Sequence, residues 1–313
     1  LLSIVKCKIG VITSIGHSHL EYFGTIEKIK KEKGLLVKRL AENGWAILNY
    51  DDEKARELEK ETRARVITFG FSEGVKVKAT ELKILNNFKE NNFGINFKLV
   101  YDCSAVPIII PVLVGESAVL SALAAAGVGI VYGMNLVEIS KALKNFKQPP
   151  GRMNTLKGIK DTVIIDDTYN SSPQSSIAAL KTISVISLNG VGARKFAVFG
   201  DMFELGSYSE DGHREVGRKA AKAGIDFLIT VGERSRDIDR GAKEKGMSED
   251  RIFHFSDTKK AGLFLQERIR SGDLILVKGS QGMRMEKIVK EIMADPLRAE
   301  EFLVRQGKEW ERK

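Results

Sequence analysis

Apolar and polar positions follow two different rhythms along this 313-residue chain. After about residue 150, short apolar runs alternate regularly with amphipathic stretches, and this repeating strand–helix order predicts an α/β fold with a mostly parallel, Rossmann-like sheet wrapped by helices. The expected strands are "TVIIDD", "KFAVFGD", "DFLITVG", "RIFHFS" and "DLILVKG", and the helices after them are expected to begin near Pro173, His213, Ser235, Thr258 and Arg284.

The first part of the chain, up to about Phe146, has a mixed pattern. A β-rich stretch from Val75 to Val112 contains "NFKENNFGINFKLVY", whose alternation is typical of a hairpin. The prolines and glycine of "FKQPPGRMN" predict a linker, so we expect two domains, residues 1–147 and 148–313. The other elements expected in the first domain are a strand at 9–15, a helix at 26–42, the strand "WAILNYDD", the helix "EKARELEKE", the strand "RVITFGF", the helix "AVLSALAAAGVGIVYG" and a helix at 136–145.

The helix expected at 26–42 carries a lysine on its apolar stripe. Ile26, Ile29, Leu36 and Leu40 follow helical spacing, and the position that completes the series is Lys33. A long side chain can snorkel from the edge of such a stripe. Alternatively, burial lowers the pKa of a lysine, and the neutral amine can capture carbon dioxide as a carbamate able to hold Mg²⁺. The pattern alone leaves both interpretations open.

Composition narrows the class of protein. Hydrophobic residues make up 43% of the chain and charged residues 29%, which is typical of a globular protein. The net charge of +9 comes from basic residues scattered among acidic ones, so we expect a solvated basic surface and no nucleic-acid partner. No apolar run approaches the ~20 residues that cross a bilayer. Cys7 and Cys103 form no metal-ligand pattern, which favours a reducing cytoplasm.

Polar residues cluster where several expected strands end, the edge at which parallel sheets bind ligands. Asp166 and Asp167 end one strand, and their adjacency leaves two interpretations equally open: a ribose or metal contact, or an ordinary strand-to-helix turn. The following Ser171/Ser172 and Pro173 are typical of a helix cap. The run "KGSQGMRME" places Lys-Gly-Ser between a strand and a helix, which suits an anion.

Other motifs are weaker or missing. His17 and His19 follow the first expected strand, where capping or packing competes with metal binding. The chain contains neither a GxxxxGK[ST] phosphate loop nor a GxGxxG turn after any strand. It opens with Leu1 and lacks an initiator methionine, so we expect a fragment of a longer protein.

Taken in order, these segments resemble the Mur ligases. More narrowly, the sequence is similar to those members that join D-alanyl-D-alanine to a UDP-N-acetylmuramoyl-tripeptide, and the resemblance runs from one end of the chain to the other. The matching blocks are "IGVITSIGHSHLEYFGTIEKIKKEKG", "GWAILNYDD", "GRMN", "IIDDTYNSSPQSSIAAL", "GDMFELG", "KGSQGMRME" and "LVRQGKEW".

The resemblance implies an ATP-dependent carboxylate–amine ligase of peptidoglycan precursor synthesis, acting through an acyl phosphate in the cytoplasm as a monomer. Its cofactors would be ATP and Mg²⁺, and its partners would be the UDP-N-acetylmuramoyl-tripeptide and D-alanyl-D-alanine, without membrane insertion. It also implies roles for individual residues. These are His19 and carbamylated Lys33 as catalytic metal ligands; Asn49, Asp51, Ser121, Arg152 and Asp167 for the nucleotide; and Asn170, Lys278, Gly279 and Ser280 for the substrate.

The chain also departs from the family pattern. Relatives have an N-terminal domain and a central domain with a phosphate loop, and this sequence enters the central domain midway. We therefore expect these residues alone not to catalyse ligation. Where relatives carry asparagine near the adenine, this chain has Ser121, which weakens that contact. Two alternatives stay open: another Mur or folylpolyglutamate-type amide ligase, and a non-catalytic binding module derived from a ligase.

Overall fold

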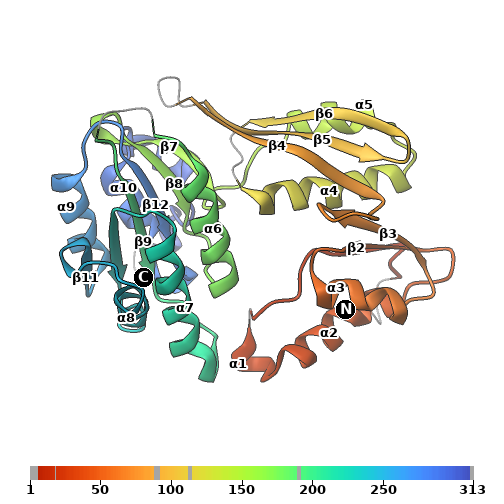
Figure 1. Ribbon diagram of the computed structural model, residues 1–313, viewed down its shortest axis with the longest axis horizontal. Coiled ribbons are helices and arrows are strands. Elements are labelled where there is room, and N and C mark those ends of the chain that lie inside the picture. Colours follow the sequence, from red (N-terminus) through yellow and green to blue (C-terminus); the bar gives the residue numbers. More distant parts are fainter. Residues whose placement is uncertain (1–5, 18, 88–91, 112–114, 189–191, 311–313) are drawn as a thin grey trace. The chain divides into compact units, whose positions relative to one another are not determined.

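The computed structural model describes residues 6–17, 19–87, 92–111, 115–188 and 192–310. The chain forms two compact units (Figure 1), one built from segments of residues 1–146 and the other containing Lys147–Lys313. Each unit has its own six-stranded sheet.

The first unit contains a sheet with the strand order β1-β2-β3-β4-β5-β6. The strands β1 to β4 run parallel, and β5 and β6 form an antiparallel hairpin that turns at Asp102, whose φ is 50°. The turn of the hairpin expected in residues 87–101 lies outside the described residues. The strands are β1 (Ile9–Ile12), β2 (Trp45–Asn49), β3 (Arg65–Gly70), β4 (Val77–Asn87), β5 (Asn92–Tyr101) and β6 (Ser104–Pro111).

Small residues let the helices of the first unit lie close to its sheet. A Cβ on Gly10 of β1 would come within 3.2–3.4 Å of two side chains of α2 and of Leu40, which follows that helix. A Cβ on Gly127 of α4 would lie 3.0 Å from Ile47 of β2. The Ala- and Gly-rich run is therefore a buried helix, as predicted. The helices are α1 (Leu20–Phe23), α2 (Ile26–Lys38), α3 (Glu53–Glu57), α4 (Glu116–Val131) and α5 (Leu136–Lys144).

The second unit confirms the expected α/β alternation. Its strand order is β11-β10-β9-β12-β8-β7, and every neighbouring pair is parallel except β7–β8. The antiparallel edge strand β7 was not predicted from the sequence. The strands are β7 (Asn154–Lys157), β8 (Val163–Asp167), β9 (Lys195–Gly200), β10 (Phe227–Val231), β11 (Ile252–Phe255) and β12 (Leu274–Lys278).

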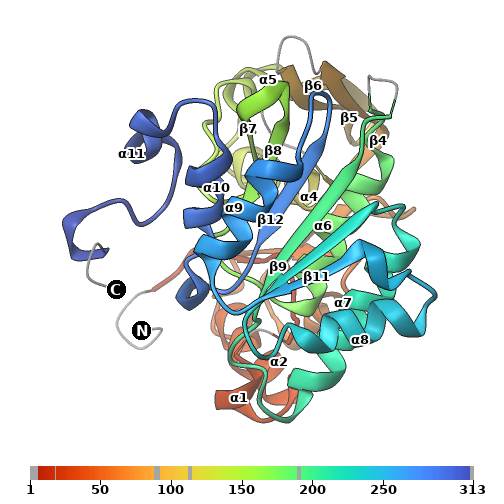
Figure 2. The same cartoon turned by 90° about the vertical axis from the view of Figure 1, so that its left-hand side faces the viewer.

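Helices cover both faces of this second sheet. In Figures 1 and 2, α6, α7 and α8 lie on one side of the strands, and α9 and α10 lie on the other. Because α7 leaves β9 toward one face and α10 leaves β12 toward the other, the strand order switches beside β12, and the carboxyl ends there form the expected binding edge. The helices are α6 (Pro173–Val185), α7 (Ser209–Lys222), α8 (Arg236–Glu244), α9 (Thr258–Arg268), α10 (Glu286–Ile292) and α11 (Ala299–Phe302).

Some expected boundaries were wrong by several residues. Helix α2 ends at Lys38, four residues before the predicted end, because the chain must turn to enter β2. Helix α7 begins at Ser209, four residues before His213. Its first turn carries Glu210 and Asp211, whose charges favour a helix N-terminus, and His213 lies fully buried inside the helix.

Candidate functional site

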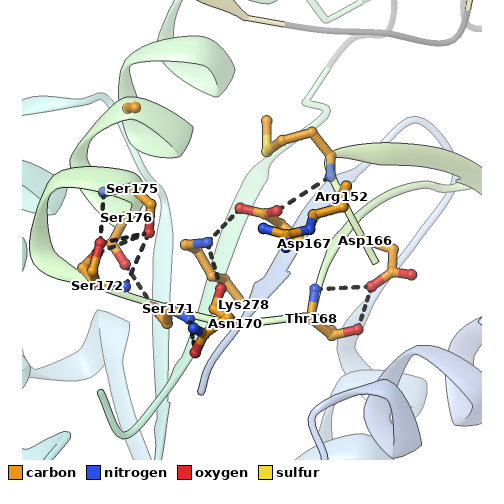
Figure 3. Close-up of polar contacts among 12 residues, drawn as sticks. Arg152, Asp166, Asp167, Thr168, Asn170, Ser171, Ser172, Ser175, Ser176 and Lys278 are labelled. Carbon is orange, nitrogen blue, oxygen red and sulfur yellow. Dashed lines mark hydrogen bonds and ion pairs between the residues drawn. The ribbon is translucent and has the colours of Figure 1, made fainter. Parts of the chain in front are cut away.

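A buried ion pair lies at the carboxyl ends of two neighbouring strands. Asp167 and Lys278 are partners in the β8–β12 register, and the Lys278 Nζ lies 2.6 Å from Asp167 Oδ2 (Figure 3). Lys278 is only 2% exposed, and its ammonium also donates to the Asn170 carbonyl at 2.9 Å. The Met153 N–H donates to the other Asp167 oxygen at 3.2 Å. The structure thus brings together three candidate site residues, of which Asp167 and Lys278 were expected at this edge from the strand pattern and Asn170 was implied by the family resemblance.

Burial and charge act against each other on the Asp167 carboxyl. Burial raises its pKa, and the Lys278 ammonium beside it opposes that rise. The Met153 N–H and the Arg152 guanidinium oppose it as well. Asp167 is thus held by a cation and a backbone donor, and it remains 8% exposed at the sheet edge.

Arg152 presents a cation at the same edge. Its guanidinium carbon lies 3.8 Å from the centre of the Tyr169 ring, which is a close cation–π contact. Arg152 is exposed, and Tyr169 is 41% exposed. Figure 3 shows Arg152 and Asp167 side by side. A solvent-facing guanidinium on an aromatic support is suited to an anionic ligand such as a phosphate.

The serine-rich segment after Asn170 caps α6, as predicted. Ser172 is the N-cap residue, Pro173 occupies the first turn, and Ser172 and Ser175 form a reciprocal capping box. The Asn170 side-chain oxygen accepts from the Ser171 N–H at 2.9 Å, so it stabilises the turn into the helix. Asn170 itself is exposed. Figure 3 shows a chain of contacts that runs from Ser176 through Ser171 and Asn170 to Lys278.

Gly279 and Ser280 shape the loop after β12. A Cβ on Gly279 would lie 2.6 Å from the Met285 Cγ and 3.2 Å from the Gly200 Cα, so only glycine fits. The Ser280 hydroxyl accepts from the Phe203 N–H at 2.8 Å, and Ser280 is 3% exposed. In the structure Gly279 and Ser280 thus pack against the residues that follow β9 and stabilise the loop at the sheet edge.

Sequence reasoning missed the part played by His213. This fully buried histidine accepts from the Met202 N–H at its Nε2 (2.9 Å) and donates from Nδ1 to the Ser209 carbonyl (2.7 Å). Burial lowers its pKa, which keeps the ring neutral, as these two bonds require. His213 therefore holds the segment that follows β9. A histidine near the start of an expected helix was the only available signal.

The apolar stripe of α2 places Lys33 in line with apolar side chains, but the structure does not bury Lys33. Lys33 is exposed, and the buried residues of α2 are Ile29, Gly34 and Val37. The helical phase was read correctly, but β1, on which this helix packs, already ends at Ile12. Lys33 therefore faces the loop that follows the strand.

The end of the Lys33 side chain is nevertheless partly desolvated. Its Nζ donates to the Ser14 carbonyl at 3.0 Å. Desolvation lowers the pKa of the amine, and the nearby Asp52 carboxylate opposes this effect. Asp52 also caps α3 and accepts from the Ile15 N–H at 3.0 Å, so it fixes the loop beside the amine. The larger effect is desolvation, which makes the neutral amine more accessible.

The two predicted magnesium ligands, His19 and Lys33, both lie in the first unit. His19 lies immediately before α1 in a left-handed conformation, with φ 63°. Within the described ranges, no three or more His, Cys, Asp and Glu residues are grouped in a way that could hold a metal ion. A lysine ammonium only donates hydrogen bonds, so Lys33 fits Mg²⁺ only after its conversion to an oxygen-bearing carbamate.

The remaining nucleotide candidates of the first unit make internal contacts. The Asn49 amide donates to the Thr13 carbonyl at 2.8 Å and accepts from the Asp51 N–H at 3.0 Å. The Asp51 carboxylate accepts from the N–H groups of the two residues that follow β3, at 2.6 and 3.1 Å. Ser121 is exposed on α4, and its hydroxyl donates to the Ser117 carbonyl at 3.0 Å.

Comparison with known families accounts for both units. Residues 1–129 match the Mur ligase middle domain, and residues 151–281 match the Mur ligase, glutamate ligase domain. The chain belongs to the Mur ligase family. The order of the two matches agrees with the order of the two sheets. No helix in the described part of this Mur ligase chain combines the length and the apolar character needed to span a membrane.

Individual Mur ligases show how much of the family's length is represented. The chain is 31% identical over 289 residues to the UDP-N-acetylmuramoyl-tripeptide–D-alanyl-D-alanine ligase of Bacillus subtilis, covering 92% of this chain and 59% of that protein. The crystal structure of MurF from Acinetobacter baumannii has a TM-score of 0.78 at 27% identity, with coverage of 94% and 60%. MurF from Thermotoga maritima, in complex with ADP, has a TM-score of 0.78 at 25% identity, with coverage of 93% and 62%. The chain thus spans about three-fifths of these relatives.

Proposed function

We propose that this chain is part of an ATP-dependent ligase that joins D-alanyl-D-alanine to a UDP-N-acetylmuramoyl-tripeptide in the cytoplasm. The observation that carries the proposal is similarity extending through both domains to a relative of that name, at 31% identity. The use of ATP is supported by the similarity to a MurF ligase whose structure was determined in complex with ADP. The monomeric state is part of the same proposal.

The proposed reaction has two steps. The tripeptide carboxylate attacks the γ-phosphate of ATP, which gives an acyl phosphate and ADP. The free amine of D-alanyl-D-alanine then attacks the acyl carbon, and inorganic phosphate leaves. Preorganised cations lower the barrier of such steps because charge on the phosphoryl oxygens is stabilised without reorganisation.

In the second unit, the sheet edge would hold the nucleotide and the incoming amine. The Asp167 carboxylate would accept a ribose hydroxyl, and the exposed Arg152 guanidinium would meet the phosphates. Lys278 holds Asp167 and the Asn170 carbonyl in place, so it orients both sides of this edge. Asn170, Gly279 and Ser280 would form the wall on the D-alanyl-D-alanine side.

In the first unit, Lys33 as a carbamate and His19 would hold Mg²⁺, with Asn49, Asp51 and Ser121 on the nucleotide side. When bound, the ion would neutralise charge on the ATP phosphates. The Lys33 carbamate would form by attack of the neutral amine on carbon dioxide, with loss of one proton. Desolvation, which lowers the pKa of this amine, supports the reaction.

The carbamate is testable without any assay of activity. In buffer containing ¹³C-bicarbonate, we expect a carbamate carbon resonance in the wild-type chain that disappears in Lys33→Ala. Lys30→Ala is the matched control, because the hydrogen bond of Lys30 to Glu57 raises the pKa of that amine and disfavours carbamate formation. A resonance that survives Lys33→Ala would remove the carbamate from this position.

The reaction itself is tested with the protein encoded by the whole reading frame that contains this chain. We expect phosphate release from ATP in the presence of UDP-N-acetylmuramoyl-tripeptide to depend on D-alanyl-D-alanine. Glutamate, in place of the dipeptide, should not support it. Support by glutamate alone would favour a folylpolyglutamate-type or other amide ligase over the proposed one.

A further inference from the structure

The two adjacent aspartates of β8 face opposite sides of the sheet. Asp167 points toward Lys278, whereas Asp166 is fully buried on the other side, as Figure 3 shows. One Asp166 oxygen accepts from the Thr168 N–H at 3.1 Å and from the Thr168 hydroxyl at 2.6 Å. The other oxygen has no hydrogen-bond partner among the described residues. The site edge therefore has a second, buried polar layer behind it.

A buried carboxylate connects this layer to the C-terminal segment. Glu286, the first residue of α10, is fully buried. It accepts from the Arg284 Nε at 2.5 Å and from the Arg305 Nη2 at 3.0 Å. The Arg305 side chain is only 4% exposed. Burying an arginine together with a carboxylate costs free energy of desolvation, so this ion pair is not explained by stability alone.

Arg305 also binds the loop that follows Asp167 through hydrogen bonds. Its Nη2 donates to the Thr168 carbonyl at 2.5 Å, and its Nη1 donates to the Tyr169 carbonyl at 3.3 Å. The guanidinium thus bridges two consecutive carbonyls and the Glu286 carboxylate. The planar guanidinium reaches these acceptors from two separate nitrogens, whereas a lysine ammonium carries all its donors on a single atom.

The loop bound by Arg305, Thr168–Asn170, makes contacts of the proposed nucleotide edge. Tyr169 is the ring under Arg152, and the Asn170 carbonyl accepts from Lys278. A shift of the loop would move the support of Arg152 and one of the two acceptors that hold Lys278. Arg305 is far away in the sequence, but it binds the backbone of the residues that make these contacts.

The backbone around this network is itself constrained. Arg305 has a φ of 57° and Arg284 a φ of 55°, a left-handed conformation that non-glycine residues rarely adopt. The Arg284 guanidinium donates to the Trp310 carbonyl at 2.9 Å and lies 5.3 Å from the Trp310 ring centre. Strained residues persist where surrounding contacts overdetermine them. The segment from Arg305 to Trp310 is thus fastened at both ends.

We propose that Arg305 is a positioning residue of the nucleotide edge, through which the C-terminal segment fixes the Thr168–Asn170 loop. The expected effect on catalysis rests on the proposed function, but the hydrogen bonds of Arg305 to the loop belong to this chain whatever its activity. It assigns a task to the "LVRQGKEW" block, which the proposed reaction leaves without one.

The first test is hydrogen exchange of the 313-residue chain, followed by mass spectrometry. In Arg305→Ala we expect the amides of residues 168–172 to exchange about 10-fold faster, with amides of β9 unchanged, because local opening is favoured without global unfolding. Arg305→Lys keeps the charge but loses the fork, and we expect an intermediate rate. Arg298→Ala, which removes an exposed ion pair with Glu301, is the matched control and should change neither segment.

The second test uses the protein from the whole reading frame. We expect Arg305→Lys to raise KM for ATP about 5-fold while KM for D-alanyl-D-alanine stays unchanged, since an orienting contact on one substrate is weakened. Unchanged exchange at residues 168–172 overturns the proposal, and so does an unchanged KM for ATP in an active enzyme. An inactive wild type instead overturns the proposed function, and this is seen before any variant is compared.

Discussion

At the scale of single residues, two identical neighbours have different physics. Asp167 is held by an ammonium and a backbone N–H, whereas Asp166 is bonded to Thr168 through one oxygen only. Burial, and to a lesser degree the Asp167 and Glu286 carboxylates, raise the pKa of Asp166 to about 7, although its bonds with Thr168 oppose this. The two aspartates look equivalent in the sequence, but Asp167 belongs to an ion pair and Asp166 is a buried acid.

The raised pKa of Asp166 predicts a pH dependence of stability. Between the unfolded pKa of 3.8 and about 7, the folded chain retains a proton that the unfolded chain releases. Stability should therefore fall as pH rises through this window and level off above it. The loss is at most about 4 kcal/mol, at about 1.4 kcal/mol per pH unit. Asp166→Asn mimics the protonated acid, and we expect it to flatten this fall.

The measurement is urea unfolding of the chain at pH 5, 6, 7 and 8, followed by the fluorescence of Trp310 in a Trp45→Phe background. Asp250→Asn, at an exposed position of the same unit, is the control and should retain the wild-type slope. A variant Asp166→Asn with an undiminished slope would show that another group titrates in this range.

The Asp167–Lys278 pair makes a second residue-scale prediction. Lys278→Met leaves a buried carboxylate without its cation, and we expect a loss of roughly 3–5 kcal/mol of unfolding free energy. The double variant Lys278→Met/Asp167→Leu removes both charges and should be more stable than the single variant. Both are measured by the same urea unfolding. A single variant as stable as the wild type would mean that the pair is not desolvated in solution.

At the scale of elements, apolar runs were sufficient to predict the strands of the second unit. Each of the five strands expected there is present, because a buried parallel strand must be nearly continuously apolar. Strand β7 was missed because "NTLK" is short and half polar, and its pairing with β8 depends on the fold. The apolar stripe could not decide whether Lys33 is buried, because helical phase does not reveal where the facing strand ends.

The residues of the candidate site also fall into those that the sequence could predict and those that it could not. Sequence reasoning placed Asp167 and Lys278 together because the carboxyl ends of parallel strands meet at one edge. Arg305 was beyond its reach, since nothing in local spacing shows that a residue of the C-terminal segment returns beneath the loop after β8. His213 shows the same limit, because its bonds join a helix to a strand end.

The packing of α7 on α8 gives a prediction for these elements. A Cβ on Gly217 would lie 1.9 Å from the Ile238 carbonyl oxygen, and one on Gly241 would lie 2.1 Å from the Arg214 carbonyl oxygen. Because backbone cannot move aside like a flexible side chain, we expect Gly217→Ala to destabilise the unit by at least about 2 kcal/mol. Lys219→Ala, exposed on the same helix, should be nearly neutral. Equal thermal unfolding midpoints for the two variants would contradict this close approach.

At the scale of the whole molecule, two sheets of the Mur ligase family follow one another in one chain that spans about three-fifths of its relatives' length. The buried contacts of the second unit converge on one sheet edge from both faces: Lys278 and Asp167 on one, Glu286 and Arg305 on the other. The proposed ligase activity gives this convergence a purpose, and it is the central claim that remains to be measured.

The most direct measurement is phosphate release from ATP by the protein of the whole reading frame, with UDP-N-acetylmuramoyl-tripeptide and with or without D-alanyl-D-alanine. We predict release that requires the dipeptide and is not supported by glutamate or diaminopimelate. If the reading frame supplies a GxxxxGK[ST] phosphate loop and release still does not depend on D-alanyl-D-alanine, the ligase account is contradicted, and a ligase-derived binding module takes its place.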